Sequence, residues 1–310
     1  MKNAYIVDGL RTPFGKFRGS LASIRTDDLL AHVLKNLIDR NTSIPKEAYD
    51  DVIIGCANQA GEDNRNVARM SALLAGLPWS VPGETINRLC SSGLSSIIHA
   101  NRAIKAGDGD LFLSGGVEHM TRAPLVMSKS ARAFGGDSKI YDSSFGWRFV
   151  NPKMVELYGT EAMGQTAENL VDKFNITRED QDAFALRSQQ KAAAAQINGR
   201  LSEEIIPIEI PRRKQDPLVF DKDEFIRHDT SAEALAKLRP AFRKEGGTVT
   251  AGNASGLNDG AAAVIVASED AVKEYNLKPI ARIVASAVVG VEPRIMGIGP
   301  VYAKIGRAHV

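Results

Sequence analysis

The chain has 310 residues, long enough for about two domains that each bury an ordinary core. Its 39 Lys and Arg residues nearly balance its 37 Asp and Glu residues, and the net charge of +2 provides no global field for binding nucleic acid or an anionic membrane. Hydrophobic residues make up 44% and charged residues 25% of the chain, which excludes a disordered or fibrous protein. We therefore expect a packed enzyme or binding protein.

The cysteine count and the lengths of the apolar runs indicate the cellular compartment in which we expect the protein. Two cysteines, Cys56 and Cys90, are too few for a disulfide scaffold or a structural zinc site. The N-terminal residues enter a strand-like run without the pattern of a signal peptide. The longest apolar run, residues 261–267, is far shorter than the roughly 20 residues of a membrane span. We expect a cytoplasmic protein with no membrane span and, since no two of its five histidines share a helix face at ligand spacing, no metal site.

The first third of the chain alternates strand-like and helix-like segments. Apolar periodicity predicts strands at 5–8, 51–55 and 110–114, and helices at 26–39 and 66–74. A further helix carries Leu94, Ile97, Ile98, Asn101 and Ile104 at helical spacing and ends at a cap on Gly107. Strand, helix and strand in succession predict a parallel pair joined by a crossover.

The middle of the chain differs from both ends. Residues 120–247 hold Gly/Ser-rich loops and a charged stretch without regular strand alternation, which predicts an inserted, loop-rich subdomain. Its clearest helix follows Thr177, the start of a capping-box-like sequence, and ends at Gly199. The α/β pattern then returns with a strand at 260–268, a short helix capped by Ser268 and a strand at 280–291.

Cys90 lies where a predicted strand turns into a helix, in the sequence Asn87-Arg88-Leu89-Cys90-Ser91-Ser92-Gly93. Backbone N–H groups and the helix dipole at such a position stabilise a thiolate, which makes Cys90 a candidate nucleophile. Position alone leaves a second interpretation open, a small buried filler in a strand-to-helix turn. No nucleotide-binding glycine motif and no Gly-x-Ser-x-Gly elbow occurs, which argues against a dehydrogenase, an NTPase and a serine hydrolase.

The sequence around Cys90 resembles the nucleophile motif of the thiolases, the acyl-CoA C-acyltransferases. Four further segments resemble that family in the same order, namely 11–15 (RTPFG), 114–120 (SGGVEHM), 238–242 (LRPAF) and 250–261 (TAGNASGLNDGA). The resemblance implies an α/β, thiolase-like fold of layered α-β-α-β-α type, with an inserted loop domain. It also implies that Cys90 is the catalytic nucleophile.

The resemblance divides the chain into expected domains. Residues 1–120 and 248–272 would form the thiolase N-terminal domain and residues 121–247 an inserted loop domain that binds coenzyme A. Residues 273–303 would begin an incomplete C-terminal half, and residues 304–310 would be a non-native tail. The family's other catalytic groups, a His, a second Cys and an Asn, lie on the motifs Gly-His-Pro, Cys-x-Gly-x-Gly and Asn-Glu-Ala-Phe, none of which occurs here. We therefore expect this fragment to be inactive, the product of a reading frame cut short.

The resemblance also implies how coenzyme A, a co-substrate rather than a permanently bound cofactor, is recognised. Arg227 would contact its nucleotide end, and the pantetheine arm would pass the residues Ala241, Phe242, Ser255 and Leu257. Met163 would border the acyl group. Biosynthetic thiolases have His before this Met, whereas this chain has Ala162, which argues against a short-chain biosynthetic role. Family members are homodimers or homotetramers and bind neither nucleic acid nor membrane.

Two segments, 55–70 and 146–152, are most similar to the thiolases that cleave 3-oxoadipyl-CoA to succinyl-CoA and acetyl-CoA in the catabolism of aromatic compounds. A substrate with a free carboxylate calls for a cation, which Arg65 or Arg148 could supply; each is equally well explained as a solvated surface arginine. Three alternatives stay open: a non-catalytic acyl-CoA-binding fragment, an acetoacetyl-CoA or general 3-ketoacyl-CoA thiolase, and, less favoured because of residues 250–261, a ketoacyl synthase relative.

Overall fold

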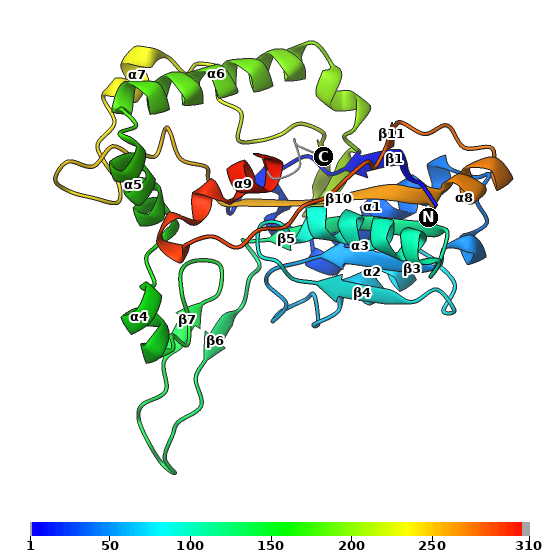
Figure 1. The fold of residues 1–310 in the computed structure, drawn as a ribbon, viewed down its shortest axis with the longest axis horizontal. Coiled ribbons are helices and arrows are strands. Elements are labelled where there is room, and N and C mark those ends of the chain that lie inside the picture. The colour runs from blue at the N-terminus through cyan, green and yellow to red at the C-terminus, as the bar shows by residue number, and fades with distance from the viewer. Residues whose placement is uncertain (1, 306–310) are drawn as a thin grey trace. The chain divides into compact units, whose positions relative to one another are not determined.

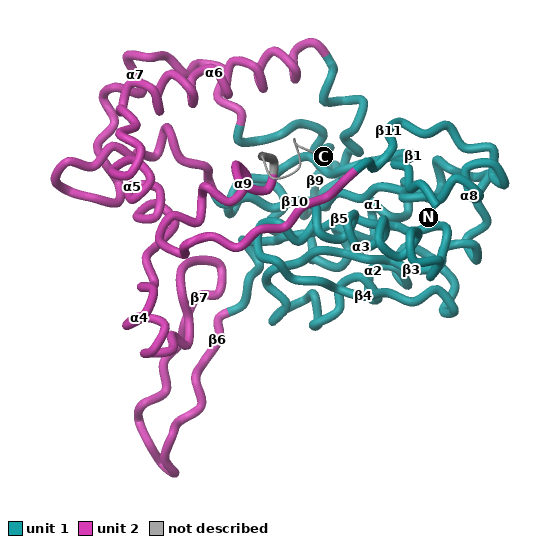
Figure 2. Tube along the Cα trace, in the orientation of Figure 1, with its two compact units in different colours: residues 1–124, 199–225, 257–284 teal, residues 125–198, 226–256, 285–310 magenta. Residues whose placement is uncertain are grey.

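The structure, a computed structural model, describes residues 2–305 and divides the chain into two compact units. Unit 1 comprises residues 1–124, 199–225 and 257–284, and unit 2 comprises residues 125–198, 226–256 and 285–310 (Figure 2). Residues 199–225 belong to unit 1 because Arg11 binds both carboxylate oxygens of Asp223, at 2.7 and 2.9 Å, and also Glu204, at 2.8 Å. The units therefore divide the chain at residues different from the expected domain boundaries.

A seven-stranded mixed sheet forms the centre of unit 1 (Figure 1). Its order is β11-β1-β10-β5-β3-β4, with β2 paired to β10. The strands are β1 (Ala4–Arg11), β2 (Gly15–Lys16), β3 (Asp51–Gly55), β4 (Gly83–Ile86), β5 (Leu111–His119), β10 (Asn258–Ser268) and β11 (Ala281–Arg282). Strand β3 runs parallel to β4 and β5, as the crossover pattern predicts, whereas β10 is antiparallel to its neighbours. The predicted strands at 5–8, 51–55, 110–114 and 260–268 are confirmed.

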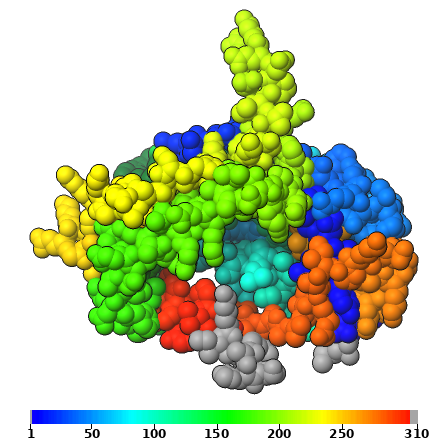
Figure 3. Space-filling view, turned by 90° about the horizontal axis from the view of Figure 1, so that it is seen from above, coloured from blue at the N-terminus to red at the C-terminus, as the bar shows by residue number. Residues whose placement is uncertain are grey.

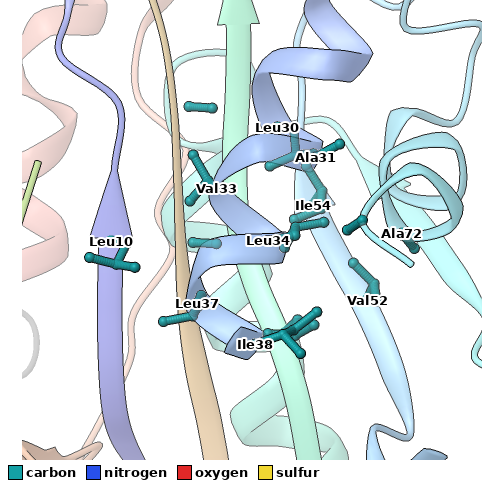
Figure 4. Packing of buried hydrophobic residues seen from close by; sticks show 14 of the residues in the cluster. Leu10, Leu30, Ala31, Val33, Leu34, Leu37, Ile38, Val52, Ile54 and Ala72 are labelled. Carbon is teal, nitrogen blue, oxygen red and sulfur yellow. The ribbon is translucent and has the colours of Figure 1, made fainter. Parts of the chain in front are cut away.

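Helices cover both faces of this sheet. On one face, α1 (Thr26–Arg40) and α2 (Val67–Leu74) pack against Val52 and Ile54 of β3, and Figure 4 shows Leu34 of α1 beside Ile54. On the other face, α3 (Ser92–Ala106) packs against Ile53. Because successive strand residues point to opposite faces, the short apolar run of β3 serves both layers. Each fully buried leucine contributes about 1.5–3 kcal/mol to the free energy of unfolding.

The expected helix ends are confirmed by their caps. The Thr177 and Ser268 hydroxyls accept hydrogen bonds from backbone N–H groups at the starts of α6 (Arg178–Ile197) and α8 (Glu269–Glu274). Gly107 ends α3 at φ +87°, a conformation in which a side chain would be strained.

Unit 2 is rich in loops, as its sequence predicts. Besides α6 it contains the helices α4 (Pro152–Tyr158), α5 (Met163–Phe174), α7 (Ala232–Ala236) and α9 (Gly299–Ile305) and the 3₁₀ segment η4 (Pro293–Ile298). Two short strands, β6 (Leu125–Met127) and β7 (Ile140–Asp142), pair antiparallel and are joined by the long loop 128–139. Within residues 2–305, no helix combines the length and apolar character needed to span a membrane.

The predicted strand at 280–291 is wrong over most of its length. Only Ala281 and Arg282 pair, with β1, while residues 283–292 have no regular structure. A strand needs a partner for its backbone groups, and among the described residues β1 binds only this short stretch, with the N–H groups of Ile280 and Ile283 on either side of the pair donating to the carbonyls of Ile6 and Ala4. Several apolar side chains of the segment lie in solvent, since Ile280 is 70% and Val284 69% exposed, whereas Ile283 packs against the core.

The sequence also failed to predict a hairpin in unit 1, formed by β8 (Ile208–Arg212) and β9 (Gln215–Phe220). Its tip projects as a narrow finger (Figure 3) and carries the exposed run Arg212, Arg213 and Lys214. Of the expected non-native tail, residues 306–310 lie outside the described residues.

Candidate active site

The two cysteines occupy opposite environments. Cys90 lies between β4 and α3, just before the N-cap residue Ser91, and its side chain is exposed. The first turn of a helix presents backbone N–H groups and the positive end of the helix dipole to such a residue. Cys56, by contrast, is 1% exposed at the end of β3. Burial, together with the Glu118 carboxylate, raises the pKa of Cys56 well above its usual range, and this thiol stays protonated.

The turn that carries Cys90 has an unusual backbone. Leu89 adopts a left-handed conformation with φ +49°, which costs a bulky residue on the order of 1–3 kcal/mol. Its N–H group donates to Asn87 Oδ1 at 2.8 Å, and its carbonyl accepts from Ser92 Oγ at 2.6 Å. Ser92 Oγ also accepts from the N–H group of Arg88 at 2.7 Å. Two polar side chains thus hold the turn in the shape that exposes Cys90.

Glycines let the start of α3 approach the sheet. A Cβ atom on Gly55 would lie 2.1 Å from the carbonyl carbon of Ser92, and a Cβ on Gly116 would lie 3.2 Å from Cα of Gly93. The buried Ser96 hydroxyl contacts the N–H and C=O groups of Gly115, both at 2.9 Å. The glycines that end β3 and continue β5 therefore set the position of the helix that carries the thiol.

Unit 2 contains a second cluster of expected site residues. Met163 begins α5 with its side chain 62% exposed. The next residue, Gly164, lies against the Phe242 ring, because a Cβ atom there would be 2.1 Å from Phe242 Cγ. Ala162 is the N-cap residue, and its N–H group donates to Gln165 Oε1 at 3.2 Å. The structure thus brings Met163 and Phe242, 79 positions apart in the numbering, to one end of α5.

A fully buried carboxylate fixes this arrangement. Glu168 of α5 is 0% exposed and accepts hydrogen bonds from the N–H groups of Thr248 and Val249, at 2.9 and 2.8 Å. The Val249 carbonyl in turn accepts from the Ala241 N–H group at 2.9 Å. Hydrogen bonds to a charged acceptor contribute about 1.5–3 kcal/mol each, which makes Glu168 the main anchor of the loop that carries Ala241 and Phe242.

A second anchor lies on α6. Asp182 accepts from Asn253 Nδ2 at 3.0 Å and from Arg178 Nε at 2.7 Å. Asn253 Oδ1 accepts from the Thr250 N–H group at 2.8 Å, which closes a tight turn two residues before Ser255. Ser255 itself is exposed. Both loops of the expected coenzyme A site in unit 2 are therefore tied to helices by buried carboxylates.

Two further residues of the expected coenzyme A site, Arg227 and Leu257, belong to different units. Arg227 is exposed, and its backbone N–H group donates to Gln189 Oε1 of α6 at 2.9 Å. Leu257 belongs to unit 1, where its carbonyl accepts from the Phe17 N–H group at 2.9 Å.

The two candidate carboxylate-binding arginines belong to different units. Arg65 lies in unit 1, is exposed, and has φ +65°. Arg148 lies in unit 2, is half-buried, and donates to the Ser143 carbonyl at 3.4 Å. Over residues 2–305, no group of three or more His, Cys, Asp and Glu side chains is placed to hold a metal ion.

Sequence reasoning missed the carboxylates that organise these loops. Glu118 and Glu168 each accept two backbone N–H groups from a neighbouring loop, and neither was expected to have a role. The signal was present for Glu168, since it lies one turn beyond Gly164 on the same face of α5. A charged residue on the packed face of a helix or in a mostly buried strand calls for a polar partner.

Comparison with known proteins agrees with this geometry. Residues 4–270 match the family profile of the thiolase N-terminal domain. The chain is 59% identical over 300 residues to a beta-ketoadipyl-CoA thiolase of Acinetobacter baylyi, a match that covers 97% of this chain and 75% of the relative. It is 56% identical over 303 residues to the 3-oxoadipyl-CoA/3-oxo-5,6-dehydrosuberyl-CoA thiolase of Escherichia coli, covering 98% of this chain and 75% of the relative.

A solved structure extends the likeness to the fold. The acetyl-CoA acetyltransferase of Bacillus anthracis superposes with a TM-score of 0.89 at 41% identity, covering 99% of this chain and 75% of that chain. The mixed sheet with helices on both faces is thus a thiolase fold. The chain belongs to the thiolase family, as its five sequence segments predict.

Proposed function

We propose that this chain carries the nucleophile of a thiolase that cleaves 3-oxoadipyl-CoA to succinyl-CoA and acetyl-CoA. The observation that carries the proposal is the exposed Cys90 thiol, held at the start of α3 by a strained turn within the family's nucleophile motif. The choice of substrate is supported by the relatives that are 59% and 56% identical, whose names specify beta-ketoadipyl-CoA and 3-oxoadipyl-CoA.

In the proposed reaction, the Cys90 thiolate attacks the 3-keto carbon of the substrate. The bond between carbons 2 and 3 then breaks, a succinyl thioester remains on Cys90, and acetyl-CoA leaves after protonation of its carbanion. The thiol of a second coenzyme A takes the succinyl group and regenerates the thiolate. The backbone N–H group of Cys90 and the dipole of α3 would stabilise the oxyanion formed by each attack.

The remaining catalytic groups of the family are not supplied by the motifs in this sequence. The three motifs that carry the His, the second Cys and the Asn do not occur in the 310 residues, and the chain spans about 75% of the relatives' length. Cys56 is no substitute for the second Cys, because its thiol is buried and its pKa is raised. We therefore expect this chain by itself to catalyse no thiolysis.

Coenzyme A would be bound as a co-substrate, with no permanently bound cofactor. Its pantetheine arm is narrow and largely apolar, and Met163, Ala241, Phe242 and Ser255 of unit 2 would provide small or apolar surface for it, while the contact of Leu257 stays a prediction from the resemblance. Arg227, exposed beside α6, would pair with a phosphate at the nucleotide end. The anchored loops of unit 2 support this assignment, since a site of fixed shape loses less entropy when it binds.

The free carboxylate of 3-oxoadipyl-CoA would pair with Arg65 or Arg148. In a protein that restores the missing part of the thiolase, such as the joined protein described below, replacing that arginine with Ala should reduce cleavage of 3-oxoadipyl-CoA while sparing acetoacetyl-CoA, which lacks the carboxylate. Arg213→Ala, at the tip of the β8–β9 hairpin, is the matched control. If neither variant changes the ratio of 3-oxoadipyl-CoA cleavage to acetoacetyl-CoA cleavage, neither arginine binds the substrate carboxylate and both are solvated surface residues.

The decisive test joins residues 1–301 of this chain to the final part of the Acinetobacter baylyi relative, which restores a full-length thiolase. The joined protein should cleave 3-oxoadipyl-CoA faster than acetoacetyl-CoA. Cys90→Ser should abolish the activity, whereas Cys56→Ser should preserve it. Activity that survives Cys90→Ser would overturn the proposal, and a preference for acetoacetyl-CoA would identify a general 3-ketoacyl-CoA thiolase instead.

A second function, binding of acyl-CoA without turnover, is favoured by the anchored loops of unit 2 and needs no missing group. Calorimetric titration of the 310-residue chain with coenzyme A distinguishes the two. Binding without turnover in the joined protein would support this second function. The homodimeric or homotetrameric assembly and the cytoplasmic location stay predictions.

A further inference from the structure

We propose that Glu118 is a positioning residue for Cys90, acting through the loop after β3 and the side chain of Asn87. This inference rests on the proposed role of Cys90 as nucleophile. Every group it invokes belongs to unit 1, and every link in it is a hydrogen bond between described residues.

The first link arises where β3 ends. Strands β3 and β5 pair as far as Gly55 and Gly116, after which β5 continues to His119 while the chain after β3 turns away. The Cys56 N–H group still donates to Ile86 of β4, but the next two N–H groups have left the sheet and need other acceptors. Glu118 supplies them: Oε2 accepts from the Ala57 N–H group at 2.8 Å and Oε1 from the Asn58 N–H group at 3.1 Å.

The second link joins this loop to the nucleophile turn. Asn87 Nδ2 donates to the Ala57 carbonyl at 3.0 Å, while Oδ1 of the same side chain accepts from the Leu89 N–H group at 2.8 Å. The Glu118 carboxylate thus binds the N–H groups of Ala57 and Asn58, and the Asn87 amide binds the carbonyl group of Ala57. Leu89 is the left-handed residue next to Cys90, and its conformation depends on such support.

A carboxylate suits this position better than a neutral group. Its two oxygens both accept, whereas an amide has one acceptor and would point N–H groups at another N–H group. The groups that face Glu118 are polar and acidic: burial and the nearby Asp63 carboxylate raise its pKa, while the two backbone donors oppose the shift. The Cys56 Sγ atom lies 4.0 Å from Oε1. The surroundings of Glu118 disfavour its charged form. A carboxylate at such a place indicates a function that needs both of its hydrogen bonds, to the N–H groups of Ala57 and Asn58.

The test measures the alkylation rate of Cys90 by iodoacetamide, followed by mass spectrometry of the peptide that begins at Leu89. The variants Glu118→Gln, Asn87→Ala and their double combination form a cycle. We expect each single variant to slow alkylation of Cys90 by about threefold or more, because the turn relaxes and the thiol leaves the start of α3. The double variant should be no slower than the slower single variant, since both changes break one chain of contacts.

Asp259→Asn is the matched control. Asp259 is buried, whereas Glu118 is half-buried. Asp259 lies on the strand paired with β5 and accepts from the backbone and hydroxyl of Thr121, which are far in sequence from the nucleophile turn. It should lower the melting temperature without changing alkylation of Cys90. If Glu118→Gln does not fold, Glu118→Asp, too short to reach both N–H groups, replaces it in the cycle.

Two results would overturn the inference: an alkylation rate unchanged in the Glu118 variant, or single effects that add fully in the double variant. A loss of rate in Asp259→Asn equal to that in Glu118→Gln would do so as well, since it would show a general loosening of the sheet. Alkylation needs no substrate, and the outcome is independent of whether the joined protein proves to be a thiolase.

Discussion

The two units are stabilised in different ways. Both large clusters of buried hydrophobic residues lie in unit 1, where α1, α2 and α3 cover the sheet. The described residues of unit 2 bury few apolar side chains, such as Leu235 and Val249, and are tied together by buried acids such as Glu168 and Asp182. Cys90, the proposed nucleophile, thus lies on a densely packed scaffold, and the expected coenzyme A loops are placed by a few strong polar contacts.

This difference has a consequence for function. A reacting sulfur must be held within a fraction of an ångström, which a close-packed layer of helix on sheet achieves. Loops that admit and release a long ligand need a defined shape with less packing behind it. We therefore expect damage to unit 1 to be global and damage to unit 2 to be local.

The largest effect is expected from the core of unit 1. Leu34 of α1 is 0% exposed within the apolar cluster, and Leu34→Ala should lower the free energy of unfolding by about 2–5 kcal/mol. Urea denaturation followed by circular dichroism measures it. Leu73→Ala, at a residue 42% exposed, is the control and should cost under about 0.5 kcal/mol. Equal costs at the two positions would contradict the packing described for unit 1.

A smaller and local effect is expected in unit 2. Glu168→Gln leaves backbone N–H groups of Thr248 and Val249 poorly paired and should cost about 1–3 kcal/mol. Proteolysis should become faster within residues 241–256, and hydrogen exchange in α1 should stay unchanged. If α1 loses protection to the same extent, the two units do not respond separately.

The pH dependence tests an ion pair of unit 1. Hydrogen bonds from Arg122 hold the pKa of Glu62 below its usual value of 4.5. A carboxylate whose pKa is lower in the folded than in the unfolded state adds stability above the unfolded value, and this stability is lost as the pH falls through the folded value. Thermal melts should therefore show falling stability below about pH 4.5, with a weaker slope in Glu62→Gln. Identical slopes would contradict the pairing.

The smallest effect is expected on the outer surface of α1. Lys35 and Asp39 form an exposed pair four residues apart. Lys35→Ala should change the free energy of unfolding by only about 0.3–0.5 kcal/mol, because water and side-chain entropy offset most of the attraction. If the free energy of unfolding falls by more than about 1 kcal/mol in the same urea experiment, surface charges contribute to stability more than this description of the core allows.

The elements with strong periodicity were predictable from sequence. The helix at 26–39 is found at Thr26–Arg40 and the strand at 51–55 at Asp51–Gly55, because apolar spacing and buried packing agree there. The strand at 280–291 failed because apolar composition predicts β structure only if a partner edge exists. The β8–β9 hairpin was not predicted because Pro207, Pro211 and Pro217 interrupt the alternation of apolar and polar residues that indicates a strand. Ile208 and Ile210 are nevertheless both buried.

The site shows the same limit. The position of Cys90 at the start of a helix follows from a local pattern of strand, turn and helix, and the structure confirms this placement. The contacts of Glu118 with Ala57 and of Glu168 with Thr248 join residues 61 and 80 positions apart. No local pattern encodes such a pairing, because it depends on where two strands or a helix and a loop end in three dimensions.

The most direct test of the central claim is to find the acyl group on the protein. The joined protein is mixed with 3-oxoadipyl-CoA in the absence of free coenzyme A, quenched with acid and digested, and the peptide that begins at Leu89 is weighed. We predict a succinyl group on Cys90 and an unmodified peptide in the Cys90→Ser variant. A succinyl group on another residue, or turnover with no acyl group on Cys90, would contradict the assignment of Cys90 as the nucleophile.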